Sequence, residues 1–168
     1  MSVYWDYQNV RINRFNPYFA RYCQTFANLH GSLLSQKVYS YWRKENQVYE
    51  QRLYKLGFDC IDIPTTEKQS VDKKLIADCE RELYSTLSAD ILILITGDGD
   101  YKNFVRKWKA QGKQVFIFAN SKNASQKLLY LADEYYFVDK KTARIICSTN
   151  QNYATSIISI YHLIWQNL

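Results

Sequence analysis

The chain has 168 residues and a mass of 20.0 kDa, which fits one domain and leaves little room for a second. Hydrophobic residues make up 47% and charged residues 23%, while five glycines and two prolines exclude a long disordered linker or a collagen-like repeat. The longest uncharged apolar run, Ile91–Thr96, is far shorter than the roughly 20 residues of a membrane-spanning helix. The N-terminal segment has an acidic residue at Asp6 and lacks the basic start and apolar core of a signal peptide. We therefore expect neither a membrane span nor a secretion signal.

The cysteines and the net charge bear on the location of the protein and on the kind of partner that it binds. The four cysteines are scattered with no C-x-x-C pair, and only two histidines could assist them, so a structural zinc site is not expected. Reduced thiols are typical of the cytosol, so the expected location is cytoplasmic. A net charge of +6 favours an anionic partner such as nucleic acid, and some of the 15 tyrosines could stack on bases.

The first third of the chain alternates strand and helix patterns. The apolar run Val3–Trp5, ended by Asp6, predicts the first strand. Asn16-Pro17 is typical of a helix start, and apolar residues from Phe19 follow at helical spacing until Gly31. Further along, the pattern predicts a strand, a helix and a strand over Lys37–Trp42, Gln47–Leu56 and Phe58–Ile63.

The second half continues the alternation. A polar loop, Thr65–Ser70, leads into a predicted helix over Val71–Tyr84. The continuous apolar run Ile91–Ile95 indicates a strand covered on both faces, and Thr96–Asp100 is the turn after it. The remaining predicted elements are a helix over Tyr101–Ala110, a strand over Val115–Phe118, a helix over Ser125–Leu131 and a strand over Tyr135–Val138. This order predicts an α/β fold: one mainly parallel sheet with helices on both faces and right-handed crossovers.

Four carboxylates are predicted to meet at one edge of this sheet. In an open parallel sheet, functional groups gather beyond the carboxyl ends of the strands. Asp6 follows the first strand, and Asp98 and Asp100 lie in the turn after the most apolar strand. Asp72 begins a helix that starts at the same edge, on the stripe that faces the sheet. Asp78 lies about 120° off this stripe and is the weaker candidate.

The clustering of these acids points to metal chemistry. Singly, each could end a strand or cap a helix. Together they would repel one another, and a divalent cation relieves this repulsion. Oxygen ligands favour Mg²⁺ or Mn²⁺, which would bind a phosphate oxygen and lower the pKa of a water for attack on phosphorus. Asn9, one turn beyond Asp6, offers an amide to position the water or the phosphate.

The ordered set of motifs resembles the NYN domain family, a PIN-like nuclease branch that includes YacP-like and LabA-like proteins. The motifs are Asp6-x-x-Asn9, Val71-Asp72-x-x-Leu75-x-x-Asp78, Thr96-Gly97-Asp98-Gly99-Asp100-Tyr101, Gln111-Gly112-Lys113-x-Val115 and Leu131-Ala132-Asp133-Glu134. The resemblance implies a Rossmann-like PIN-type domain over residues 1–139 with strand order 3-2-1-4-5. It also implies Mg²⁺-dependent RNA cleavage, with the acids carried onto Asp6, Asp72, Asp98 and Asp100.

Basic residues beside the acidic turn suggest how RNA could be bound. Lys102, Arg106, Lys109 and Lys113 recur at helical spacing, and this stripe could guide a phosphate backbone toward the acids. The alternative is an ordinary solvated helix face. Arg11 and Arg14, in the loop after Asn9, could also contact the backbone of a single-stranded RNA.

Other classes fit the sequence less well. A dinucleotide-binding module would need G-x-G-x-x-G after the first strand, which is absent. A haloacid-dehalogenase-type phosphatase would have aspartate where Gln8 stands, and a Toprim-like domain would have glutamate where Asp6 stands. The alternative that stays open is a LabA-like regulatory protein that keeps the acids but binds RNA or protein without turnover.

The C-terminal extension, residues 140–168, is not covered by the resemblance. Its stretch Asn152–Leu168 predicts an amphipathic helix whose apolar stripe must be buried. The stripe would pack either on its own domain or on a second copy in a homodimer. Its members are Ile157, Tyr161, Ile164, Trp165 and Leu168.

Overall fold

The computed structural model describes residues 1–13, 18–65 and 67–139. The predicted tail helix Asn152–Leu168, the homodimer contact assigned to it, and Arg14 all lie outside the described residues. No helix in the described ranges is long and apolar enough to cross a membrane.

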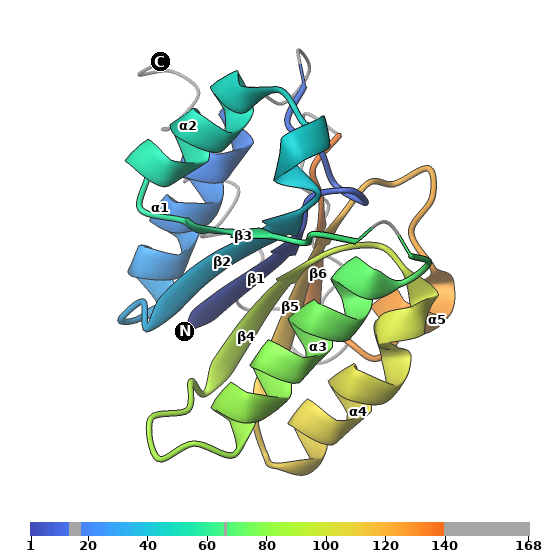
Figure 1. Cartoon of the computed structure of the whole chain (residues 1–168). Helices are drawn as coiled ribbons and strands as arrows, with labels where there is room; N and C mark the ends of the chain where they lie inside the picture. The colour runs from blue at the N-terminus through green and yellow to red at the C-terminus, as the bar shows by residue number, and fades with distance from the viewer. Residues whose placement is uncertain (14–17, 66, 140–168) are drawn as a thin grey trace.

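A parallel six-stranded sheet forms the centre of the fold (Figure 1). The strand order β3-β2-β1-β4-β5-β6 confirms the predicted 3-2-1-4-5 arrangement and adds β6 beyond β5, paired in parallel. The strands are β1 (Ser2–Asp6), β2 (Ser35–Ser40), β3 (Asp59–Asp62), β4 (Ile91–Ile95), β5 (Gln114–Ala119) and β6 (Glu134–Phe137).

Helices cover both faces of the sheet. α1 and α2 pack on one face, and α3 and α4 pack on the other, with the short α5 beside the start of α4 (Figure 1). The helices are α1 (Phe19–His30), α2 (Gln47–Lys55), α3 (Ser70–Leu83), α4 (Lys102–Ala110) and α5 (Gln126–Leu129), with short 3₁₀ helices η1 (Trp42–Lys44) and η2 (Gly99–Tyr101).

A hydrophobic core lies on each face of the sheet, between the strands and the helices that cover them, and β1 contributes to both cores. Trp5 points toward α1 and contacts the rings of Phe19 and Phe58 at centroid distances of 5.2 and 5.8 Å. Tyr4 points to the opposite face and stacks on Tyr39 at 6.2 Å. Every residue of β1 is buried, because a strand in the middle of a doubly covered sheet meets side chains on both sides.

The second strand differs from the predicted Lys37–Trp42. It ends at Ser40, and Trp42 begins η1. The Asp62 carboxylate accepts the Trp42 backbone N–H at 3.0 Å, so this amide starts a turn and does not extend the ladder. The Trp42 ring then packs on Tyr7 with centroids 5.0 Å apart, which buries a side chain that strand geometry would have left at the sheet edge.

Register brings two functional loops together. Trp5 pairs with Ile95 across β1 and β4, so Asp6 ends its strand where the turn after β4 begins. On the other side Asp6 pairs with Tyr39 of β2. The carboxyl edge of the sheet is therefore formed by the loops after β1, β2 and β4, and α3 starts at the same edge.

Candidate active site

Asp6 is a buried carboxylate held by its own loop. Its side chain is 4% exposed. Oδ1 accepts the backbone N–H groups of Gln8 and Asn9 at 3.1 and 3.3 Å, because the chain turns back immediately after β1. These two bonds fix the orientation of the carboxylate and direct Oδ2 toward α3 and η2.

Tyr101 connects this carboxylate to the next one. Its hydroxyl donates to Asp72 Oδ1 at 2.8 Å and lies 3.5 Å from Asp6 Oδ2. The side chain is fully buried, and burial raises the pKa of the Tyr101 hydroxyl well above its usual value. Tyr101 therefore keeps its proton and acts as a hydrogen-bond donor between two carboxylates, a role that the sequence pattern did not predict.

Asp98 and Asp100 form the turn after β4. Asp98 Oδ1 accepts the backbone N–H of Asp100 at 2.9 Å, and the Asp98 N–H donates to Thr96 Oγ1 at 3.2 Å. Gln69, in a left-handed conformation before α3, donates to Asp100 Oδ2 at 2.8 Å. Asp98 is half-buried and Asp100 is exposed, so the exposure of Asp98 is the more similar to that of Asp6 and Asp72.

Asn9 ties the two loops together. Its Oδ1 accepts the Gly97 backbone N–H at 2.7 Å, and its own carbonyl accepts from Asn120 Nδ2 at 3.2 Å. A Cβ on Gly97 would come within 3.0 Å of the Ala124 Cα, so glycine lets the turn approach this segment closely. The structure thus gives Asn9 a positioning role; contact of its amide with water or phosphate stays a prediction.

The electrostatics of the cluster are unfavourable for negative charge. Burial raises the pKa of Asp6 to about 7, and the charges of Asp72 and Asp98 add to this, against the lowering effect of its two backbone hydrogen bonds. Burial likewise raises the pKa of Asp72, opposed by the hydrogen bond from Tyr101 and supported by Asp98 and Asp100. In the described part of the chain, none of these acids forms an ion pair with lysine or arginine.

The donor set is chemically suited to a hard divalent cation. It consists of carboxylate oxygens, two of them on buried or half-buried side chains with raised pKa values and no cationic partner among the described residues. As placed, however, no three His, Cys, Asp or Glu side chains within residues 1–13, 18–65 and 67–139 form a group that could hold a metal ion. The chemistry therefore fits Mg²⁺ or Mn²⁺, whereas the side-chain positions do not form a closed coordination shell.

Asp78 lies apart from the acidic cluster, as expected for the weaker candidate, but it is buried although its helical angle places it off the stripe that faces the sheet. It is 7% exposed, accepts a hydrogen bond from Tyr39 at 3.0 Å and pairs with Lys74 at 2.8 Å and Arg81 at 3.5 Å. Burial follows because α3 contacts both β1 and β2. Asp78 is compensated by two cations and belongs to the structural interior, apart from Asp6 and Asp72.

The predicted RNA-contacting residues divide into two groups. Arg11 pairs with Glu45 at 2.8 Å, so its charge is directed toward the β2 side. Lys102 lies at the start of α4, directly after η2, and exposed Arg106 follows one turn later. The other members of the predicted stripe are bound within the fold: Lys109 pairs with Asp133 at 2.8 Å, and Lys113 donates to the Ala89 carbonyl at 2.7 Å.

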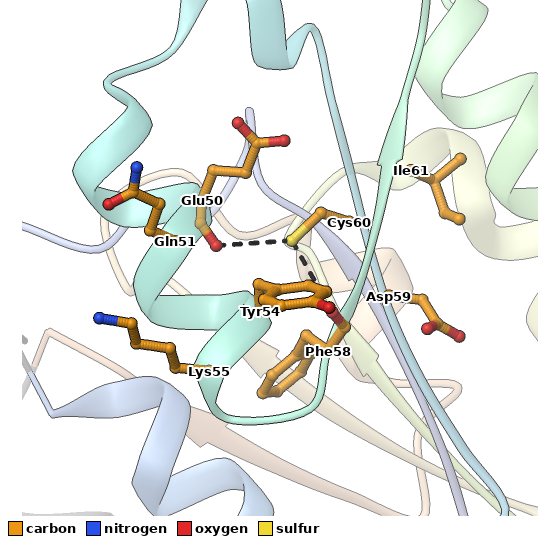
Figure 2. Close-up of a pocket in the computed structure, with 8 residues that line it drawn as sticks. All are labelled: Glu50, Gln51, Tyr54, Lys55, Phe58, Asp59, Cys60 and Ile61. Atoms are coloured by element: carbon orange, nitrogen blue, oxygen red, sulfur yellow. Dashed lines mark hydrogen bonds between the residues drawn. The ribbon is translucent and has the colours of Figure 1, made fainter.

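A pocket of about 540 Å³ lies elsewhere, between α2 and the edge strand β3 (Figure 2). The rings of Tyr54 and Phe58 line it together with Cys60, whose thiol contacts the carbonyls of Glu50 and Phe58 at 3.7 and 3.8 Å. It shares no residue with the acidic cluster. Its lining carries no arrangement of acid and base suited to attack on a phosphate, so the acidic edge remains the candidate active site.

Removing the Tyr101 hydroxyl tests the bridge. We expect Tyr101→Phe to lower the free energy of unfolding by about 1.5–3 kcal/mol where Asp72 is ionised, because a half-buried carboxylate loses its hydrogen bond. Denaturant unfolding of the metal-free protein measures the effect. Tyr130→Phe, which removes a hydroxyl from a side chain that is 89% exposed, is the matched control. Equal stability of both variants and the wild type would contradict the bridge.

Fold and site together define a class: a Rossmann-like α/β domain with acids collected at the carboxyl edge of a parallel sheet, as in PIN-like nucleases. The chain belongs to the NYN domain family, whose profile matches residues 1–139. A solved structure of a protein of unknown function from Vibrio parahaemolyticus is similar, with a TM-score of 0.71 and 21% identity over 84% of this chain and 94% of that chain. At this identity the likeness concerns the fold. Among curated proteins, none matches the sequence.

Proposed function

We propose that this protein is a metal-dependent ribonuclease that hydrolyses phosphodiester bonds at the carboxyl edge of its sheet. One observation carries the proposal: Asp6 and Asp72 share the Tyr101 hydroxyl in a buried setting where no lysine or arginine of the described residues compensates them. Membership of a family of PIN-like nucleases supports the same reaction class.

Each residue of the edge has a distinct part in this proposal. Asp6, Asp72 and Asp98 would hold Mg²⁺ or Mn²⁺, with Asp100 at the solvent side. When bound, the cation would lower the pKa of a water and neutralise charge on the phosphate. Tyr101 orients the two inner carboxylates, and Asn9 keeps the Asp6 loop against the Asp98 turn.

A second candidate is RNA or protein binding without turnover, as in a LabA-like regulator. The observation that favours it is the lack, among the described residues, of three side chains grouped to hold a metal. The two functions differ in one outcome. A nuclease shortens RNA when Mn²⁺ is present, whereas a regulator binds RNA or protein and leaves RNA intact.

The proposed nuclease is tested with full-length protein and a fluorescent single-stranded RNA. We expect cleavage with Mn²⁺ or Mg²⁺, no cleavage with excess EDTA, and recovery when Mn²⁺ is restored. Because a contaminating nuclease could give the same result, Asp98→Asn is purified and assayed in parallel. Intact RNA under all metal conditions would favour the regulatory function.

A further inference from the structure

Charge is distributed unevenly around the acidic edge. The segment from Tyr101 to Leu131, which includes α4, β5 and α5, has no aspartate or glutamate. All its charged side chains are basic: Lys102, Arg106, Lys107, Lys109, Lys113, Lys122 and Lys127. A segment with a single sign of charge beside a carboxylate site produces a positive potential on that side of the site.

Three of these cations are used within the fold. Lys107 pairs with Glu80 at 2.6 Å, Lys109 pairs with Asp133 at 2.8 Å, and Lys113 donates to Ser88 and Ala89. The others, Lys102, Arg106, Lys122 and Lys127, form no ion pair within the described residues. Their charge remains available to an outside partner.

These four cations lie on neighbouring elements. A Cβ placed on Gly99 would lie 2.9 Å from Ser125 Oγ and 3.8 Å from Lys102 Cε, so the start of α4 adjoins the start of α5. The Ser125 N–H also donates to the Gly97 carbonyl at 2.8 Å. Figure 1 shows α5 beside the beginning of α4 at the carboxyl edge. Lys102 and Arg106 on α4, Lys127 on α5 and Lys122 in the loop before α5 therefore belong to adjoining segments that begin at the Asp98–Asp100 turn.

An aromatic side chain stands on the same surface. Tyr130 is 89% exposed, and its N–H donates to the Gln126 carbonyl at 2.9 Å, so it continues the helical turn of α5. Lys127 is three residues earlier and therefore on the same side of that turn. Exposed tyrosine beside unpaired lysine is the combination that binds single-stranded nucleic acid, through base stacking and phosphate contact.

The opposite flank has different electrostatics. There Arg11 pairs with Glu45 at 2.8 Å and Arg43 with Asp62 at 3.0 Å, so these guanidinium groups are neutralised within the fold. Glu50 and Asp59 line the pocket beside them (Figure 2). Lys44 and Lys55 are exposed on that flank, but they stand among Glu45, Glu50, Asp59 and Asp62, so a phosphate backbone would meet charges of both signs there.

We infer that single-stranded RNA leaves the acidic site on one side only, across the α4–α5 surface formed by Lys102, Arg106, Lys122, Lys127 and Tyr130. Lys122 and Lys127 contact phosphates beyond the scissile one, and Tyr130 stacks on a base. The inference deepens the proposed function and rests on it for the position of the scissile phosphate.

The test measures binding of full-length protein to a short fluorescent oligouridylate in EDTA, so that cleavage does not enter. For Lys122→Ala/Lys127→Ala we expect the slope of log affinity against log salt to fall in magnitude by about 1.4, because each of the two lost phosphate contacts accounts for about 0.7. The matched control is Lys44→Ala/Lys55→Ala, which removes two exposed lysines from the opposite flank. It should leave the slope unchanged.

Stacking is tested by a second matched pair. Tyr130→Ala should weaken binding at least about fivefold. Tyr54→Ala, which removes a tyrosine that is 74% exposed on the opposite flank, should leave binding unchanged.

The outcomes separate this inference from the proposed function. If both lysine double variants lose the same amount of salt slope, the effect is one of net charge and the α4–α5 surface is overturned. The surface is also overturned if the wild-type protein does not bind the oligouridylate, or if it binds an acidic peptide in preference. The surface stands and the proposed nuclease fails if the variants show the expected pattern but the wild type never cleaves RNA with Mn²⁺. If the wild type cleaves RNA with Mn²⁺ but the variants do not show the expected changes in binding, the proposed nuclease stands and the α4–α5 surface is overturned.

Discussion

If the proposed ribonuclease uses this site, Asp6→Asn and Asp98→Asn are each expected to reduce Mn²⁺-dependent RNA cleavage by at least about 100-fold, because each would remove a negative charge and a carboxylate oxygen offered to the cation. The two changes lie in different elements, at the end of β1 and in the turn between β4 and η2, so a common effect would be hard to explain by local distortion. Single-turnover cleavage of a labelled RNA at saturating protein measures the chemical step separately from binding.

The matched control for this prediction is Asp90→Asn. Asp90 is exposed and directly precedes β4, so it lies at the amino edge of the sheet, away from the acidic cluster. Its substitution makes the same change in net charge and should leave cleavage unchanged. Normal rates in both site variants would remove Asp6 and Asp98 from the mechanism.

The second large effect concerns stability, and its sign is opposite to that of an ordinary core substitution. The pKa of Asp6 is raised from 3.8 to about 7 in the folded protein. An acid with a raised folded pKa favours folding when it is protonated, so this contribution is fully present below about pH 4 and is lost as pH rises through about 7. This difference in pKa between the unfolded and the folded state corresponds to about 4 kcal/mol of unfolding free energy.

Asp6→Asn should therefore stabilise the metal-free protein at alkaline pH. The asparagine Oδ1 can still accept the N–H groups of Gln8 and Asn9, and its Nδ2 can donate to the Tyr101 hydroxyl, which continues to donate to Asp72. We expect the variant's advantage in unfolding free energy to grow by up to about 4 kcal/mol between about pH 4 and pH 8. Denaturant unfolding across this range measures it; a pH-independent difference between variant and wild type would contradict the raised pKa.

Much of the fold could be predicted because periodic apolar patterns dominate it. The run Ile91–Ile95 indicated a strand covered on both faces, and β4 occupies these residues at the centre of the sheet. The error at Lys37–Trp42 has a tertiary cause, since alternation alone cannot show that the Asp62 side chain takes the Trp42 N–H. Contacts of this kind join residues far apart in sequence and override a local pattern.

The candidate site could be predicted only in part for a related reason. The rule that functional groups follow parallel strands brought Asp6 and Asp98 to one edge, and helix geometry placed Asp72 there. The hydroxyl of Tyr101 was missed because its ring satisfied the apolar stripe of a helix, and nothing in the spacing showed where its polar tip would lie. Its position directly after the acidic turn was the available signal. The burial of Asp78 did not follow from its helical angle, because α3 packs against both β1 and β2.

The central claim is that Asp6 is kept as a carboxylate for a divalent cation, at a cost to the metal-free fold. Thermal unfolding of the wild type and Asp6→Asn, with EDTA or with Mn²⁺ at alkaline pH, tests this most directly. We expect Asp6→Asn to have the higher melting temperature in EDTA, and Mn²⁺ to raise the melting temperature of the wild type while leaving that of the variant unchanged. Equal responses of the two proteins to Mn²⁺ would contradict it.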